Sequence, residues 1–456
     1  MAGNTTQFMN AKLASDKPIF IKAKVNHTPP HPVTQLLASN KKIVLVLANK
    51  SIQRIDQKKV EENMETIDMT KHFNGLKYKV HLAFMDPTGN HLLVSLKSSD
   101  AENLPDLLYF PPSTPGRNVQ QTKPKMSTKI RGHLVTAVAW STQNSSLTTT
   151  GPILMGTTRG LIYEAELSTE TTMFSSASIE KQWKQVYDLG KGGQVCAITS
   201  LEYHRIPKSK RFVILVSTCT RLYQFSGVVS GDPDTERPLL THIFTDYLQV
   251  SDPYIELPNS LKYSALSFYY EPKESGKMAA KLPLYALSFA WMTSEGIFHG
   301  KINPFEEDRT NFSKGCQLIQ INQQQPLGLI LTEFHAIVAY ANHVEGICLL
   351  NEQVVFEDEL DSVIKGIARD PVSGTIYVFA EYSVHKYNID HEEKHIWKVF
   401  LERGDYEKAL KYCRDDEQMD QVRLFCEIIY EENSKWIGFS GLDQTGFRSL
   451  RSRPLR

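Results

Sequence analysis

Residues 212–227 read FVILVSTCTRLYQFSG. The first half is apolar at almost every position, and after a short polar turn the second half alternates between apolar and polar residues. A strand that is apolar throughout must be covered on both faces, whereas an alternating strand has one buried face. The stretch therefore predicts two paired strands, the first deep in a packed sheet and the second farther out.

The same doublet recurs seven times along the chain. The copies occupy residues 43–56, 91–110, 153–167, 212–227, 285–302, 335–350 and 375–390. Further short strand candidates lie upstream of the copies, at residues 34–39, 79–86, 134–140, 195–203, 263–270, 326–334 and 364–370. Seven units of three to four strands predict a mainly β fold, a closed seven-bladed β-propeller in which nearly every strand edge is protected.

Two of the upstream strands end in near-identical turns, DPTG at 86–89 and DPVSG at 370–374. Proline fixes φ in such a turn, and glycine tolerates a positive φ. A pair of stacked β-sandwiches would also give short strands at regular spacing. We favour the propeller because the doublet recurs and no break in composition divides the chain in two. The Trp-Asp dipeptide of standard WD40 repeats is absent from the sequence.

The hydrophobic period changes from 2 to 3.6 residues after Asp390. Ile396, Val399 and Phe400 fall on one face of a predicted helix, which Gly404 ends. A second helix follows, and its inward residues are Ala409, Leu410 and Cys413, with Asp405 as its N-cap. A third helix is predicted over 417–433, with Val422, Phe425, Cys426 and Ile429 on one face. Short antiparallel helices of this kind are typical of an α-solenoid.

We therefore expect four segments. They are an extension leading into the propeller at 1–32, the propeller at 33–390, the start of the α-solenoid at 391–433, and a basic, disordered tail at 434–456. Inserts at 98–131, 168–194, 228–262 and 271–283 are rich in Pro, Ser, Lys and Asp, and loops on a rigid scaffold commonly carry recognition. Ile214 is expected to be buried, and Leu424, Phe425 and Ile428 to form, with Phe400, an uncovered face of the solenoid.

Composition narrows the class of protein. Lys+Arg and Asp+Glu number 51 each, so no global field draws the chain to nucleic acid or to an anionic membrane. The first ten residues do not resemble a secretory signal, and the longest apolar stretch, 327–341, is interrupted by polar residues. Six scattered cysteines form no CxxC pair, which indicates a cytosolic chain with reduced thiols.

No catalytic, cofactor-binding or metal-binding residue is predicted. GKGG at 190–193 lacks the spacing of a phosphate-binding loop and is interpreted as a turn. The sequence contains neither GxSxG nor HExxH, and its Cys and His residues have no zinc spacing. A propeller enzyme that gathers carboxylates from several blades in its central channel would escape such a search, so this class stays open as an alternative.

Five stretches resemble a known family. They are residues 79–96, 150–167, 257–270, 326–348 and 397–416, and PIF at 18–20 fits as well. In this order and spacing, over roughly residues 17–430, the chain resembles the vacuolar protein sorting 18, or Deep orange, family. The resemblance is specific because several long, non-repetitive strings match.

The resemblance implies a non-enzymatic subunit of the class C tethering complexes, HOPS and CORVET. Its expected partners are the other class C subunits and, through the complex, Rab GTPases and SNAREs, with no nucleic acid and no cofactor. The expected location is cytoplasmic, peripheral on the cytosolic face of late endosomes and lysosomes. Family members continue into a long solenoid and a RING zinc domain, neither of which this sequence contains, so we expect a short form without ubiquitin-ligase function. The alternative is a coat or pore scaffold of the same propeller–solenoid architecture.

Overall fold

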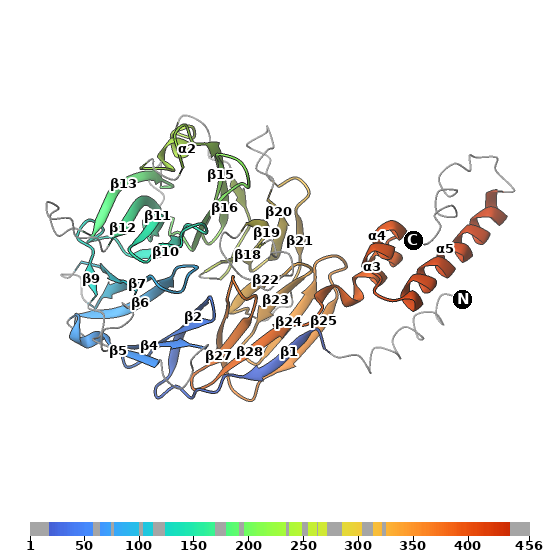
Figure 1. Ribbon diagram of the computed structural model, residues 1–456, viewed down its shortest axis with the longest axis horizontal. Helices are drawn as coiled ribbons and strands as arrows, with labels where there is room; N and C mark the ends of the chain where they lie inside the picture. The colour runs from blue at the N-terminus through green and yellow to red at the C-terminus, as the bar shows by residue number, and fades with distance from the viewer. Residues whose placement is uncertain are drawn as a thin grey trace. The chain divides into compact units, whose positions relative to one another are not determined.

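Seven antiparallel sheets of four strands each are arranged around a centre in the computed structural model (Figure 1). The structure describes residues 18–57, 64–73, 77–99, 104–112, 124–168, 179–190, 196–233, 237–248, 254–261, 263–270, 285–302, 313–321 and 325–437. The chain divides after Asp390 into two compact units, the ring of sheets and a helical unit. The predicted seven-bladed β-propeller followed by helices is confirmed.

The first six blades each use four consecutive strands. Blade one is β2 (Val33–Ser39), β3 (Lys42–Leu47), β4 (Ser51–Asp56) and β5 (Met64–Asp68). Blade two is β6 (Tyr78–Met85), β7 (Leu92–Ser98), β8 (Asp106–Phe110) and β9 (Lys125–Met126). Blade three is β10 (Val135–Ala139), β11 (Thr149–Thr157), β12 (Leu161–Ser168) and β13 (Glu180–Asp188). Blade four is β14 (Ser200–Arg205), β15 (Arg211–Ser217), β16 (Arg221–Val228) and β17 (Tyr254–Glu256). Blade five is β18 (Ala265–Tyr270), β19 (Ala286–Thr293), β20 (Gly296–Lys301) and β21 (Gln317–Ile319). Blade six is β22 (Gly328–Leu331), β23 (His335–Ala339), β24 (His343–Cys348) and β25 (Val354–Glu359).

Blade seven closes the ring with strands from both ends of the propeller. It consists of β26 (Ile364–Arg369), β27 (Ile376–Ala380), β28 (Val384–Ile389) and β1 (Phe20–Lys24). The outer strand β1 pairs with β28 from Phe20 opposite Ile389 to Lys24 opposite His385, and the two lie side by side in Figure 1. The hydrophobic pattern of the sequence predicts no strand over residues 20–24. This pairing joins the N-terminal segment to the last blade and completes the four strands of that blade.

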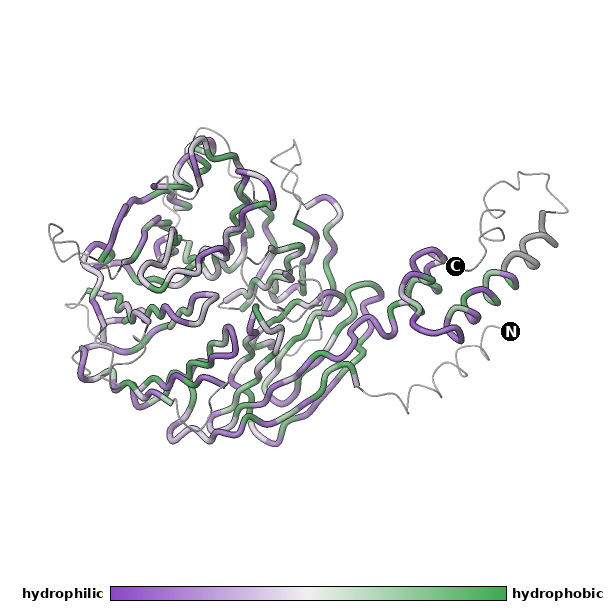
Figure 2. The backbone as a smooth tube through the Cα atoms, in the orientation of Figure 1, coloured by the Kyte–Doolittle hydropathy of each residue, from purple (hydrophilic) through white to green (hydrophobic). Residues whose placement is uncertain are grey.

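The seven doublets of the sequence are the second and third strands of the blades. In β15 every residue from Phe212 to Ser217 is buried, and Ile214 has no exposed surface, as expected. The third strands are more buried than their alternating pattern suggested, and β24 is buried throughout. The reason is that each blade packs against a neighbour on both faces, so a polar position can also be enclosed. Figure 2 shows the apolar residues along these strands and hydrophilic residues along the outer strand β13.

The fourth strands were the least visible in the sequence. Several are short, and β25 has the exposed, acidic sequence VVFEDE. The strand β13 lies inside the stretch 168–194 that was expected to be an insert, so that expectation is wrong for residues 180–188. Insert 228–262 contains the helix α2 (Thr241–Thr245) and the strand β17. Insert 271–283 lies outside the described residues.

The helical unit begins with the 3-10 helix η3 (Glu392–His395) and the helix α3 (Ile396–Glu402). Gly404 ends α3 with a φ of +74°, and the Asp405 side chain accepts a hydrogen bond from the Lys408 amide at the start of α4 (Tyr406–Tyr412). Phe400 is buried and stacks on the Tyr412 ring, 5.5 Å between centroids. It is therefore not part of an uncovered face.

The helix α5 (Asp416–Ile437) extends past residue 433. Val422 is fully buried, whereas Leu424 and Ile428 are 58% and 48% exposed, as expected for an uncovered face. Residues 438–456, which contain most of the expected tail, lie outside the described residues. Among the helices that the structure describes, none has the length and apolar character needed to cross a membrane.

Candidate functional site

Two cavities open where the innermost strands of the blades end. The inter-blade cleft, of about 180 Å³, lies between blades three and four and includes Thr142, Tyr203, Arg205 and Arg237 in its lining. The channel cavity, of about 250 Å³, takes residues from the innermost strand region of every blade. Thr142 lines both cavities, so they adjoin.

The turns beside these cavities are held by buried carboxylates. Asp86 accepts hydrogen bonds from the amides of Asn90 and His91 at 2.8 and 2.7 Å. Asp370 likewise accepts from the amides of Val372 and Ser373 in its own turn. It also accepts from the amides of Asn40 and Lys41 in blade one, at 2.9 and 2.7 Å. Blade seven is thereby tied to blade one on this face.

Glycine has a specific role in the first of these turns. Gly89 has a φ of +71°, a backbone conformation that residues other than glycine rarely adopt. A Cβ at this position would lie 2.8 Å from the Ser39 carbonyl oxygen of blade one. The turn therefore requires glycine both for its backbone conformation and for its close approach to the neighbouring blade.

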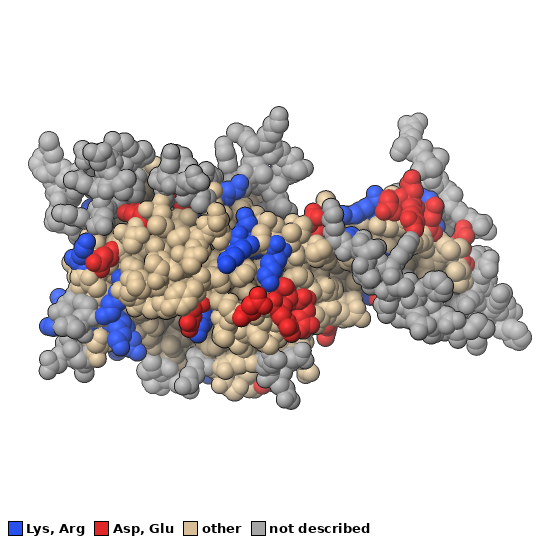
Figure 3. Space-filling model, turned by 90° about the horizontal axis from the view of Figure 1, so that it is seen from below, with Lys and Arg blue, Asp and Glu red and all other residues tan. Residues whose placement is uncertain are grey.

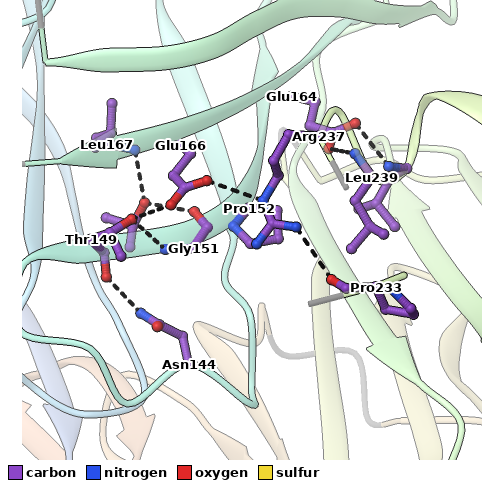
Figure 4. Close-up of polar contacts among 12 residues, drawn as sticks. Asn144, Thr149, Gly151, Pro152, Glu164, Glu166, Leu167, Pro233, Arg237 and Leu239 are labelled. Atoms are coloured by element: carbon purple, nitrogen blue, oxygen red, sulfur yellow. Dashed lines mark hydrogen bonds and ion pairs between the residues drawn. The ribbon is translucent and has the colours of Figure 1, made fainter. Parts of the chain in front are cut away.

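One wall of the inter-blade cleft is the segment that leads into α2, and Glu164 anchors it (Figure 4). Glu164 projects from β12, is 1% exposed, and accepts hydrogen bonds from the amides of Leu239 and Leu240 at 2.5 and 2.9 Å. Burial raises the pKa of Glu164, and these hydrogen bonds oppose that rise by stabilising the carboxylate. The burial of Glu164 in the strand LIYEAELS is thus explained by two amide donors at a helix start.

Arg237 fastens the same segment at a second point (Figure 4). Its Nε lies 3.1 Å from Glu166 Oε2, and its Nη1 donates to the Pro233 carbonyl at 3.2 Å. Glu166 also accepts from the Thr149 hydroxyl. Because Arg237 is enclosed by these partners, it shapes the cleft wall and supplies no reactive group.

The floor of the cleft is polar and rigid. The Tyr203 hydroxyl donates to the Pro152 carbonyl at 2.5 Å, and burial raises the pKa of Tyr203. Arg205 donates from Nε to the Ser209 carbonyl at 2.9 Å. Such groups suit the recognition of a polar surface, and they offer no nucleophile activated by a neighbouring base.

Charged residues on the propeller face in Figure 3 form small neighbouring groups of both signs. Within the described ranges, no three His, Cys, Asp or Glu side chains are grouped so that they could hold a metal ion. None of the six cysteines, all of which lie in the described ranges, forms a disulfide. The channel cavity has a single carboxylate, Glu202, among its lining residues.

Seven four-stranded blades closed by the first strand, followed by short paired helices, define a protein of the β-propeller class with a helical extension. Residues 18–389 match the Pep3/Vps18/deep orange beta-propeller domain. The chain belongs to this family, as the resemblance implied.

Curated relatives from animals and fungi agree with this assignment. The vacuolar protein sorting-associated protein 18 homolog of Danio rerio is 29% identical over 423 residues, which cover 91% of this chain and 40% of that protein. The Drosophila melanogaster homolog is 33% identical over 377 residues, 78% of this chain and 36% of its own length. The vacuolar membrane protein pep3 of Schizosaccharomyces pombe is 23% identical over 420 residues, 91% and 42% of the two chains. The chain thus spans about 40% of the length of these relatives.

Among solved structures, the WD40 repeats of RRP9 superpose with a TM-score of 0.45 and 9% identity, over 81% of this chain and 97% of that one. The fold assignment made here rests on the strand pairings.

None of the residues that line the two cavities is predicted as a site residue from the sequence. Glu164 and Glu202 each give a signal, because each is an acid flanked on both sides by buried apolar or aromatic residues. That pattern indicates a buried carboxylate, but it does not say whether a partner is present.

Proposed function

We propose that this chain acts as a non-enzymatic subunit of the class C membrane-tethering complexes, HOPS and CORVET, in vesicle docking and fusion on the route from endosome to lysosome. The observation that carries the proposal is the family match over residues 18–389, the whole described propeller. The vacuolar names of the relatives agree with a role in this transport.

The propeller is well suited to assembly. Glu164 and Arg237 hold the α2 segment against blade three, so the cleft presents a preformed surface. Preformed surfaces lose little conformational entropy when a partner binds. Activity by assembly, without catalysis, is part of the proposal.

The proposed partners are the other class C subunits and, indirectly, Rab GTPases and SNAREs. We place the chain peripherally on the cytosolic face of late endosome and lysosome membranes, held there by those partners. We further propose that residues 33–390 act as the propeller module and 391–433 as the first solenoid repeats.

Co-purification tests the proposal. A tagged chain expressed in cells should recover the remaining class C subunits, and mutation of Leu424 and Ile428 to alanine should reduce that recovery several-fold, since these side chains form an exposed apolar face on α5. Glu427→Ala, an exposed position on the same helix, is the matched control. Recovery of coat or pore proteins in place of class C subunits would support the scaffold alternative and contradict the proposal.

A further inference from the structure

The outermost strand of blade six is acidic. The strand β25 reads VVFEDE, with three acidic residues and no basic residue. The outermost strand β1 of blade seven, FIKAK, is basic, and β13 of blade three, EKQWKQVYD, carries charges of both signs. The other outermost strands that the structure describes, β5, β9, β17 and β21, have five residues or fewer and at most two acids each.

One face of β25 is held by blade seven. The Phe356 ring packs against the ring of Phe20 on β1, with 5.1 Å between centroids. Asp358 forms an ion pair with Lys22 at 2.8 Å and accepts a hydrogen bond from the Tyr387 hydroxyl at 2.5 Å. Lys22 also donates to the backbone carbonyl of Glu359. These contacts fix the strand in an extended conformation, so a partner would lose little entropy in ordering it.

The opposite face of β25 is open in the part of the chain that the structure describes. Val355, Glu357 and Glu359 alternate with the covered residues, and all three are exposed. On the neighbouring strand β24, Glu345 lies directly opposite Glu357. Residues that pair in this way share one face of the sheet. Three carboxylates therefore lie on the face that blade seven does not cover.

The charge on this face has no counter-ion among the described residues. Within those ranges, no ion pair involves Glu345, Glu357 or Glu359. Glu345 is 6% exposed and lies beside the Tyr340 phenol, which stays neutral because burial and the Glu345 charge raise its pKa. His343, opposite Glu359, stacks on the Tyr340 ring. Like charges directly opposite on adjacent strands destabilise a sheet, so a cation at this face would relieve the repulsion.

The outer edge of β25 adds backbone groups to this surface. The sheet of blade six ends at β25, and no described strand pairs with its far edge (Figure 1). An extended peptide can join such an edge: its main-chain hydrogen bonds give affinity, and its alternate side chains give specificity. Acidic side chains discourage pairing with acidic or uncharged strands, whereas a basic strand gains from them.

We propose that β25 is a docking edge for an extended, basic segment of a partner protein, which adds an outer strand to blade six. Its Lys or Arg side chains, two residues apart, would lie against Glu357 and Glu359, and an apolar side chain would contact Val355. The repeat of two residues is that of side chains on one face of a strand. This surface is additional to the tethering role, and its test uses no class C subunit.

Fluorescence anisotropy on the whole chain tests the docking edge with the labelled peptide acetyl-Thr-Lys-Val-Lys-Val-Lys-Thr-amide. A counterpart with Gln at each Lys should bind about tenfold more weakly or less. The double variant Glu357→Gln/Glu359→Gln should weaken binding of the basic peptide about threefold to tenfold, since each exposed ion pair contributes modestly. The control is Glu295→Gln/Glu402→Gln, which removes the same charge from an exposed turn of blade five and from an exposed position on α3. It should leave binding unchanged.

Hydrogen exchange separates strand addition from loose electrostatic attraction. With the peptide bound, the amides of residues 354–359 that point away from β24 should exchange several-fold more slowly, because they donate to the added strand. The proposal is overturned if exchange over 354–359 is unchanged at saturating peptide, or if the Gln peptide binds as tightly as the basic one. It is also overturned if Glu357→Gln/Glu359→Gln binds the basic peptide as tightly as the unchanged chain. A dimer in sedimentation that the peptide dissociates would identify a second copy as the occupant and would likewise overturn it.

Discussion

Glu164 and Glu202 are both enclosed glutamates on blade strands, in neighbouring blades. Glu164 accepts hydrogen bonds from two amides of a segment 75 and 76 residues away in the chain, and it clamps that segment to the propeller. Glu202 faces the channel cavity with no such donors. Burial alone therefore does not give a carboxylate its role. Two amide donors make Glu164 part of the structure, whereas at Glu202 burial raises the pKa to about 8.

The largest effect on stability is expected in the apolar core that packs against the segment held by Glu164. Ile214 is fully buried in the cluster that also contains Leu239, Leu240 and Phe244 of the clamped segment. We expect Ile214→Ala to reduce the free energy of unfolding by about 2–5 kcal/mol, because it leaves a cavity in a close-packed interior. Urea unfolding would measure the loss; a value below about 0.5 kcal/mol would mean that the strand is not packed on both faces.

Breaking the clamp should have the next largest effect. In Glu164→Gln one amide donor loses its acceptor, because the carboxamide has one oxygen and an NH₂ group. We expect a loss of about 1–3 kcal/mol, the usual result of leaving a buried donor unsatisfied. Urea unfolding beside Glu295→Gln, which should be neutral, checks the result. Equal stability of the two variants would show that Glu164 is not a clamp.

At Glu202 the same change from glutamate to glutamine should increase the free energy of unfolding, the opposite of its effect at Glu164. The pKa of Glu202 is about 8 in the folded chain and near 4.5 when unfolded, so the folded state binds more protons between these values. The contribution of Glu202 to stability is therefore greatest below about pH 4.5 and falls as the pH rises through 8. Relative to the unchanged chain, Glu202→Gln should be more stable by about 1–3 kcal/mol at pH 8.5, a discounted value because the side chain is partly open to the cavity.

Thermal or urea unfolding at pH 5, 7 and 8.5 measures this difference. The gap between Glu202→Gln and the unchanged chain should widen with pH. A gap that is constant over the three values would mean that Glu202 does not titrate in this interval and would remove the contrast with Glu164.

The smallest effect is expected at the second attachment of the α2 segment. Arg237→Lys keeps the charge near Glu166 but loses the bond from Nη1 to the Pro233 carbonyl. We expect the free energy of unfolding to fall by about 0.5–1 kcal/mol, as for the loss of one hydrogen bond in a partly exposed pair. Hydrogen exchange of the Leu239 and Leu240 amides would report it: faster exchange in Arg237→Lys than in Glu295→Gln is the expected outcome, and unchanged exchange would show that Glu164 alone holds the segment.

Local patterns in the sequence determined which residues form the inner strands of the blades and where the first helices begin and end. The apolar run 212–217 and the alternating run after it identified β15 and β16, because the burial of a strand is written in the hydrophobicity of its own residues. Gly404 and Asp405 likewise marked the boundary between α3 and α4, since a helix end and an N-cap depend on one or two residues.

Only the tertiary structure decided how distant segments meet. The pairing of Phe20–Lys24 with β28, and the bonds from Asp370 to blade one across 330 residues, depend on closing the ring. Whether Glu164 has donors, and whether Glu202 faces a cavity, likewise depends on contacts between blades. Such contacts arise only when the whole chain has folded, because hydrophobic periodicity specifies the burial of a residue and not its neighbour.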